Sequence, residues 1–157
     1  MKPLAVIAGI GGINVNPLGE SDVVRTVPIV WNSPSGLLPS LSLEALRVAL
    51  GESTILVTGD PNTTGVISSV RVGDYELPTT HDGQFWIRYR HEDPSLYVSA
   101  RTVLATGYDP ALKARLEGTI VFVGASAAGL LDIRTTTLGG NAPGVSIHAQ
   151  ILEQIMT

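Results

Sequence analysis

The sequence contains no cysteine, which excludes disulfide bonds, thiolate metal sites and cysteine nucleophiles together. It is also poor in positive charge: 10 Lys and Arg stand against 14 Asp and Glu, for a net charge of -4. A nucleic-acid partner requires a cationic footprint and an anionic membrane surface attracts one, so the composition disfavours both. No apolar run predicts a membrane span, because the charge-free stretch 119–131 is too short and the stretch 3–19 is interrupted by prolines, glycines and asparagines.

A chain of 157 residues fits one domain, and a hydrophobic content of 44% argues against disorder. We find no internal repeat and no low-complexity linker. The clearest helix is predicted over Leu41–Leu50, where leucines 43, 46 and 50 share one face and Gly51 supplies a left-handed cap.

The first half of the chain otherwise has the character of short strands. "AVIAGIGGINV" is typical of a buried strand, and "VVRTVPIVW" of a partner strand in a hairpin, where Pro28 indicates an edge or a bulge. Further strands are expected in "STILVTG" and between Gly65 and Tyr89.

The second half alternates helices and strands. Ser99 caps a predicted short helix that ends at Gly107, and Asp109-Pro110 begins another that ends at Gly118. "TIVFVG", over 119–124, has the pattern of a buried strand. A loop from Ala125 to Val145 follows, long enough to suggest a functional role, and then a helix over Ser146–Met156 with isoleucines at every fourth position.

Three chemical motifs fail when their context is considered. "GIGGIN" lacks both the third glycine and the helix that a dinucleotide-binding turn requires. Ser126, Asp132 and His148 follow the order of a hydrolase triad, but "GASAAG" is not a nucleophile elbow. The histidines at 81 and 91 lack the spacing of metal ligands, so no metal site is predicted.

His148 is the most informative titratable residue. At the start of the last helix its imidazole is expected to be neutral, either bonded to backbone carbonyls of the long loop or contacting a small ligand held between loop and helix. Arg88 and Arg90 are expected on one side of their strand and Tyr89 on the other.

Six segments occur here in an order that resembles one family. They are "VVRTVPIV", "LPSLSLEALRVALG", "WIRYR", "YVSARTVLATG", "DPALKARLEGTIVFVGASAAGLLDIRTTTLGG" and "PGVSIHAQILEQI". Together they are similar to the second type of CHASE domain, the cyclase- and histidine-kinase-associated sensory extracellular module. One departure is Ser21-Asp22, where that family often has Asp-Gly; it alters a turn and no proposed site residue.

The resemblance implies a sensory domain in the periplasm or outside a bacterial cell, as part of an inner-membrane receptor. Its implied output is an adenylate or guanylate cyclase, a histidine kinase, a Ser/Thr kinase or a diguanylate cyclase. The last helix has no stop signal, which favours a fragment of a longer protein, although a frayed end has the same pattern.

We therefore expect an α/β fold: a single domain over 1–157 with a mixed β-sheet and packed helices, in two or three layers. A ligand site is expected beyond the end of the 119–124 strand. Its predicted residues are Gly124, Ser126, Asp132, Arg134 and His148, with Arg25 and Arg90 as weaker candidates.

The alternative for this site is that the loop merely packs down, with Asp132, Arg134 and His148 as internal contacts. Three function classes stay open: a non-catalytic receptor input domain for an unidentified small molecule, a hydrolase-type or nucleotide-binding enzyme, and a homodimerisation or interaction module. We predict no cofactor and no nucleic-acid partner, and contact with the membrane only through flanking segments.

Overall fold

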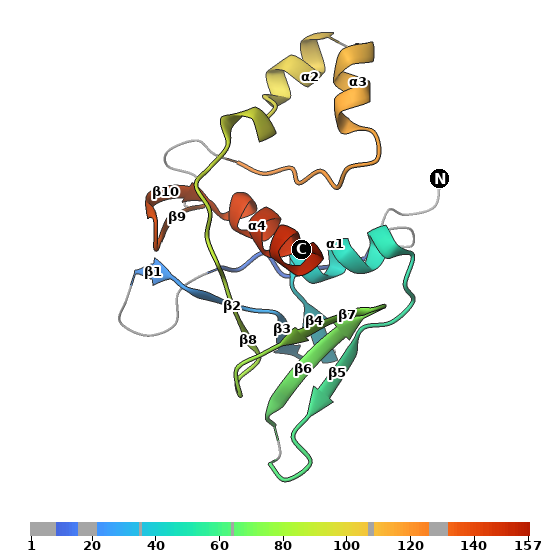
Figure 1. Ribbon diagram of the computed structural model, residues 1–157, viewed down its shortest axis with the longest axis vertical. Coiled ribbons are helices and arrows are strands. Elements are labelled where there is room, and N and C mark those ends of the chain that lie inside the picture. The colour runs from blue at the N-terminus through green and yellow to red at the C-terminus, as the bar shows by residue number, and fades with distance from the viewer. Residues whose placement is uncertain (1–8, 16–21, 35, 64, 107–108, 126–131) are drawn as a thin grey trace.

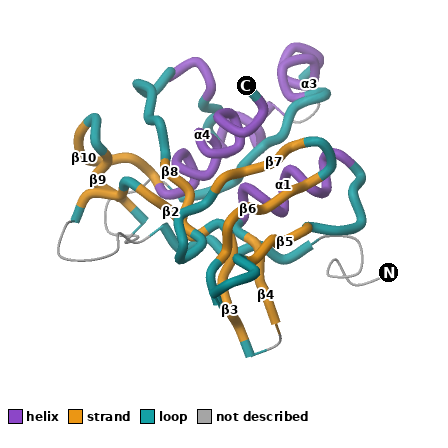
Figure 2. Tube along the Cα trace, turned by 60° about the horizontal axis from the view of Figure 1, so that its bottom comes forward, coloured by secondary structure: helices purple, strands orange, loops and turns teal. Residues whose placement is uncertain are grey.

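Two helices, α1 (Leu41–Leu50) and α4 (Gly144–Met156), pack against each other at the centre of the molecule (Figures 1 and 2). The computed structural model describes residues 9–15, 22–34, 36–63, 65–106, 109–125 and 132–157. The bounds predicted for α1 are confirmed. Its first turn is capped by Ser40, whose hydroxyl accepts a hydrogen bond from the Leu43 amide at 3.2 Å, and Gly51 closes it with a φ of 72°.

The described strands form small sheets around these helices, with the orders β1-β9-β10, β2-β8, β3-β4 and β5-β6-β7. The strands are β1 (Val23–Val24), β2 (Thr26–Pro28), β3 (Val30–Ser33), β4 (Gly36–Pro39), β5 (Leu56–Gly59), β6 (Ile67–Val72), β7 (Tyr75–Pro78), β8 (Gln84–Trp86), β9 (Ile133–Thr136) and β10 (Gly139–Pro143). Only β1 and β9 pair in parallel among them, and the other pairs are antiparallel. The mixed α/β class is confirmed, with the strands divided among several sheets.

The hydrophobic core lies between the two helices and the inner faces of the strands. The fully buried side chains include Leu43 and Leu46 of α1 and Ile147 and Ile151 of α4, as the sequence periodicity predicts. Leu50 differs from the prediction, because it lies in the last turn and is 42% exposed.

Glu44 is a charged residue of α1, yet it is only 8% exposed. Arg47 compensates its charge through two hydrogen bonds, Nε to Oε2 at 2.8 Å and Nη2 to Oε1 at 2.6 Å. Such bidentate pairing is what makes a nearly buried carboxylate tolerable.

The predicted hairpin near the N-terminus is wrong for the described residues. The segment "VVRTVPIVW" is divided into β1, β2 and β3, which pair with β9, β8 and β4 respectively. Pro28, which has no amide to donate, ends β2. Residues 9–15 form no strand beyond a single bridge between Gly12 and Ser40.

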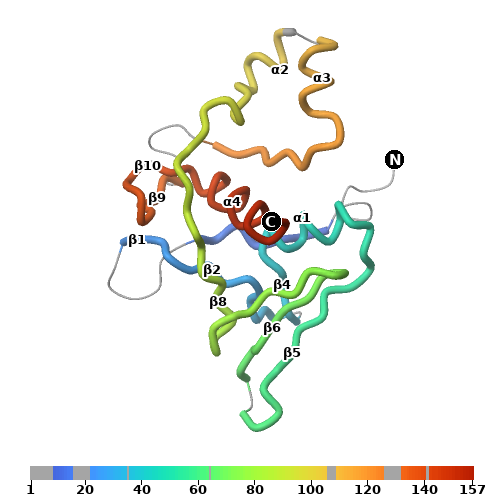
Figure 3. Tube along the Cα trace, viewed as in Figure 1, coloured from blue at the N-terminus to red at the C-terminus, as the bar shows by residue number. Residues whose placement is uncertain are grey.

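The segment between residues 91 and 125, called here the arm, contains no buried residue in its described parts. It comprises the 3₁₀ helix η2 (Pro94–Leu96) and the helices α2 (Ala100–Thr106) and α3 (Pro110–Leu116). Figure 3 shows it as an excursion that leaves the body after β8 and returns before β9. The predicted helix starts are confirmed: Ser99 accepts from the Arg101 amide at 3.2 Å and Asp109 from the Ala111 amide at 2.9 Å.

The predicted central strand at 119–124 is wrong. No described residue pairs with it, and its side chains alternate: Val121 and Val123 are 53% and 90% exposed, while Ile120 and Phe122 pack against the core. Apolar alternation favours an extended backbone, but a strand forms only where another strand supplies hydrogen bonds.

The long loop predicted over 125–145 contains the hairpin β9–β10. The prediction is therefore wrong for residues 133–136 and 139–143, which form strands. The last helix begins at Gly144 after Pro143, and Ser146 is not its cap. Instead, the Ser146 hydroxyl donates to the Pro143 carbonyl at 2.8 Å and to Glu92 Oε1 at 2.9 Å. Within the described ranges no helix combines the length and apolar character that a bilayer crossing needs.

Candidate functional site

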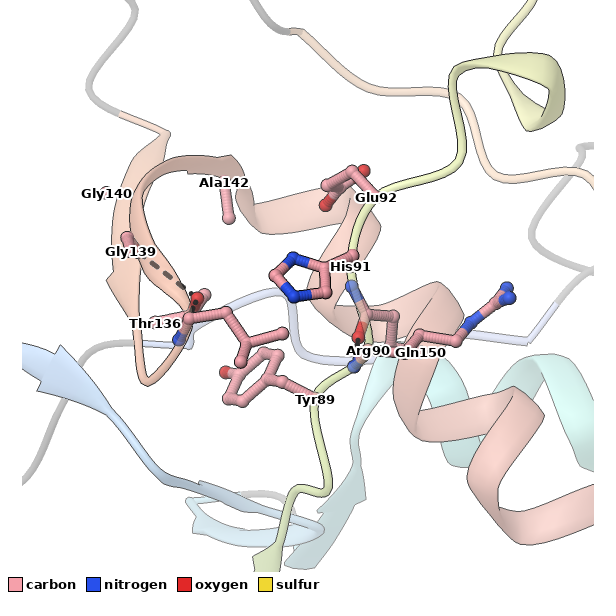
Figure 4. Close-up of a pocket in the computed structure, with 10 residues that line it drawn as sticks. Tyr89, Arg90, His91, Glu92, Thr136, Gly139, Gly140, Ala142 and Gln150 are labelled. Carbon is pink, nitrogen blue, oxygen red and sulfur yellow. Dashed lines mark hydrogen bonds between the residues drawn. The ribbon is translucent and has the colours of Figure 1, made fainter.

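A cavity of about 280 Å³ opens between three segments: the extended stretch 89–92, the hairpin β9–β10 and helix α4 (Figure 4). We call it the Tyr89 cavity. Tyr89, His91 and Glu92 line it from the stretch, Thr136 and Gly139 from the hairpin, and Gln150 from the helix.

The stretch 86–90 is held on α4 by two glutamines rather than by a neighbouring strand. Gln150 Oε1 accepts from the Arg90 amide at 3.0 Å, and Gln154 Oε1 accepts from the Arg88 amide at 2.8 Å. Four helical residues rise about 6 Å and two extended residues about 6.6 Å, so glutamines one turn apart match alternate backbone amides. Gln154 also donates from Nε2 to the Trp86 carbonyl at 3.1 Å.

Tyr89 is half-buried and packs against the core. Its hydroxyl oxygen is buried and has no hydrogen-bond partner among the described residues. Burial raises the pKa of this phenol, so it is a neutral donor. A buried hydroxyl without a partner costs free energy, and a polar ligand in the cavity would remove that cost.

His91 and Glu92 supply the other polar groups of the cavity. The His91 imidazole projects into it in Figure 4, whereas the Arg90 guanidinium points away and donates to Glu153 Oε1 of α4 at 2.6 Å. Glu92 accepts the Ser146 hydroxyl, which anchors its carboxylate at the first turns of α4. The Thr136 hydroxyl already donates its hydrogen bond to the Gly139 carbonyl at 3.1 Å. Among the described lining residues these contacts form no nucleophile–base pair.

Three of the predicted site residues lie around the start of α4, as expected. The Asp132 carbonyl accepts the Gly144 amide at 2.8 Å, and a Cβ added at Gly144 would lie 2.3 Å from Asp132 Oδ1. Gly124 lies against Val145, where an added Cβ would come within 2.6 Å of the Val145 Cβ. Glycine is therefore required at both positions for close packing.

His148 is 1% exposed and bonded on both ring nitrogens, with 2.9 Å between Nδ1 and the Ser42 hydroxyl and 3.3 Å between Nε2 and the Ile13 carbonyl. Since a carbonyl only accepts, the neutral ring donates from Nε2, and the single Ser42 hydroxyl proton is shared between Nδ1 and the His148 carbonyl, which lies 3.1 Å from the hydroxyl oxygen. Burial lowers the pKa of His148, while the Ile13 carbonyl and the nearby Asp132 oppose that shift. Both ring nitrogens of His148 are therefore engaged by described residues.

The predicted arginines have different surroundings. Arg90 borders the Tyr89 cavity, Arg25 borders a different cavity, and Arg134 is half-buried on β9, where it donates from Nη1 to the Ile133 carbonyl at 3.2 Å. Ser126 lies outside the described residues. Over the same ranges, no group of three or more His, Asp or Glu side chains is arranged to hold a metal ion.

The residues of the Tyr89 cavity were not predicted as a site. His91 and Glu92 have the appearance of loop charge in the sequence, and Gln150 has that of an exposed helix position. The available signal was the pair Gln150 and Gln154, four residues apart on the polar side of a helix with a buried isoleucine stripe. That pair predicts that the helix is hydrogen-bonded to a neighbouring segment, but it does not predict which segment of the chain this is.

The CHASE2 domain family model matches residues 2–157, nearly the whole chain. The chain therefore belongs to the CHASE2 family, as the order of its segments predicts. CHASE2 domains are extracellular sensory domains of signalling receptors. No curated protein and no solved structure shows significant similarity to the chain.

Proposed function

We propose that this chain is the non-catalytic input domain of a bacterial transmembrane receptor, and that its signal is a small polar molecule bound in the Tyr89 cavity. The observation that carries the proposal is the buried Tyr89 hydroxyl, which has no hydrogen-bond partner among the described residues that surround it. Ligand pockets contain a few convergent polar groups, and Tyr89, His91 and Glu92 supply such groups here beside the apolar Leu138 and Ala142.

The position of the cavity supports a role in signalling. Its stretch 89–92 and its hairpin both contact α4, through Gln150 and through the Gly144 amide. A ligand that binds one arrangement of these three segments more tightly than another shifts the population of α4 positions. We propose an adenylate or guanylate cyclase as the output, with histidine or Ser/Thr kinases as the alternatives that the family association leaves.

The polar groups indicate a ligand with both acceptors and donors. Tyr89 offers a donor, Glu92 an acceptor, and His91 either, depending on its tautomer. The cavity is near the lower end of the roughly 300–1,000 Å³ common for small-molecule sites, so we expect a molecule of a few to about a dozen heavy atoms.

The substitution Tyr89→Phe tests this function because it should move stability and binding in opposite directions. Removing an unpartnered buried hydroxyl should leave the free energy of unfolding unchanged or raise it by up to about 1–3 kcal/mol. The same change should weaken at least one of the ligands that raise the unfolding midpoint of the wild type in a screen of small anions, sugars and nucleotides.

Tyr97→Phe, an exposed tyrosine of the arm, is the matched control and should alter neither quantity. A ligand whose stabilisation survives Tyr89→Phe and His91→Ala unchanged does not occupy this cavity. Turnover of generic ester substrates would instead support an enzyme.

A further inference from the structure

A second cavity of about 290 Å³ lies on the outer face of the β2–β8 pair, among the described residues. In this pair Val27 faces Phe85, and both are buried in the core. Side chains alternate along a strand, so Thr26 and Trp86 lie together on the opposite face. Thr80, Asp82 and Gln84 complete one side of the cavity, and Arg25 another.

Trp86 is the apolar part of this cavity. It is 60% exposed, although Phe85 before it and Ile87 after it are buried. An indole exposes a large flat surface and is the side chain best suited to stack on a ring.

Gln84 is a buried polar residue in the lining of the cavity. It is 7% exposed, and its Oε1 is buried with no hydrogen-bond partner among the described residues. Such an orphaned amide oxygen indicates a missing donor, since buried amides are nearly always paired. The backbone around it is fixed: the Gln84 amide donates to the Thr80 hydroxyl at 3.0 Å, and the Thr80 amide donates to the Gln84 carbonyl at 2.8 Å.

The charged groups of the cavity balance each other. Arg25 and Asp82 bring one charge of each sign, so the net charge of the lining favours neither cations nor anions. Thr80 donates a hydrogen bond to Asp82, which lowers the pKa of that carboxyl and keeps it an acceptor at neutral pH. A neutral molecule rich in hydroxyl groups can donate to Asp82 and Gln84 and accept from Arg25 at once.

From this combination we propose that the Trp86 cavity is a binding site for a neutral sugar ring, which stacks its C–H face on Trp86 and directs hydroxyl groups to Asp82 and Gln84. The site is distinct from the Tyr89 cavity and does not depend on the function proposed for it. Its volume suits one ring, near the lower end of the roughly 300–1,000 Å³ range of small-molecule sites.

The intrinsic fluorescence of Trp86 provides the test, because the chain has only two tryptophans and the other, Trp31, can be removed as Trp31→Phe. Glucose, galactose, mannose and N-acetylglucosamine are titrated up to about 100 mM, and at least one should give a saturable change with a Kd of about 1–10 mM. Glucuronate and adenosine serve as the anionic and the stacking counter-probes.

Saturation-transfer NMR on the wild type and its variants then locates the bound sugar. Trp86→Ala should weaken binding about tenfold or more through loss of stacking, and Asp82→Asn about fivefold through loss of a charged acceptor. Tyr97→Ala removes an exposed aromatic side chain from the arm and should leave the Kd unchanged.

Three results would overturn the proposal: no saturable change with any neutral sugar, binding that survives Trp86→Ala, or tighter binding of glucuronate or adenosine than of every neutral sugar. None of them bears on the Tyr89 cavity, whose own test depends on Tyr89→Phe. Circular dichroism of each variant confirms that a loss of binding does not come from unfolding.

Discussion

The helices of the body and those of the arm differ in burial far more than in sequence signal. Helices α1, α2 and α3 begin at capping side chains, and α4 begins after Pro143 without one. In contrast, α1 and α4 bury leucines and isoleucines in the core, whereas the described residues of α2 and α3 bury none. Caps and propensity therefore determine where a helix starts and stops. Only burial makes it contribute to global stability.

The lengths of the helices fit this difference. α2 and α3 have seven residues each, below the roughly 12–15 at which isolated helices become marginally stable. Local hydrogen bonds at Ser99 and Asp109 support them. We expect the amides of the arm to exchange with solvent by local opening, without unfolding of the body.

The largest predicted effect comes from truncating matched apolar side chains in the two regions. Ile151→Ala in α4 should lower the free energy of unfolding by about 2–5 kcal/mol, because it leaves a cavity at a fully buried position. Leu104→Ala in α2 should change it by less than about 0.5 kcal/mol, because that leucine is 84% exposed. Urea denaturation followed by circular dichroism measures both.

If Ile151→Ala and Leu104→Ala lower the free energy of unfolding equally, the arm is buried in solution, against another part of the protein or a second copy. Repeating Leu104→Ala at several protein concentrations separates these cases, since only a second copy makes the loss depend on concentration.

A smaller change in the free energy of unfolding is expected from pH, and it comes from His148 in the body of the molecule. The folded-state pKa of His148 lies below its unfolded value of 6.5, so above pH 6.5 the ring is neutral in both states. As the pH falls below 6.5, the unfolded chain binds a proton at this histidine and the folded protein does not. The free energy of unfolding should therefore fall with pH until the folded-state pKa is reached. The measurement is the free energy of unfolding from about pH 8 to about pH 5.

His148→Gln should flatten this part of the profile, whatever it does to the absolute stability. A slope that survives in His148→Gln would assign the pH dependence to other groups.

The smallest effect is predicted at the junction of the two regions. Arg90 and Glu153 form an ion pair with side chains 48% and 49% exposed, which ties the base of the arm to α4. Glu153→Gln should cost less than about 1 kcal/mol, and the cost should vanish in high salt. Glu76→Gln on β7 removes the same charge from a different element and is the variant with which Glu153→Gln is compared. If the loss of unfolding free energy in Glu153→Gln persists in high salt, this ion pair is shielded from solvent.

Much of the fold could be predicted wherever the relevant interactions are local. The helix over 41–50 and the starts at Ser99 and Asp109 follow from caps a few residues away, and the isoleucines of α4 follow from helical periodicity. Strand pairing is not local: "VVRTVPIVW" has one continuous β pattern but three different partners. The apolar pattern at 119–124 is consistent with the observed alternation of exposed and inward side chains, but it does not predict the absence of a described partner strand.

The site was predicted less well, for the same reason. The sequence groups Gly124, Asp132 and His148 because a predicted loop joins the first two to the last helix, and all three do lie around the start of α4. It does not show that Ser42, more than 100 positions away, engages the His148 ring, or that Gln150 holds the stretch that forms the Tyr89 cavity. Both contacts join segments remote in the chain, and no periodicity encodes such pairs.

By itself, then, the sequence determined the family, the α/β class, the capped helices and the faces that α1 and α4 turn to the core, because these depend on order, spacing and neighbours within one or two turns. The tertiary structure decided how the strands divide into sheets, which residues line the Tyr89 and Trp86 cavities, and that the described parts of the arm bury no side chain. These features depend on which distant segments meet, since a backbone group finds a partner and an apolar side chain leaves water only where another part of the chain packs against it.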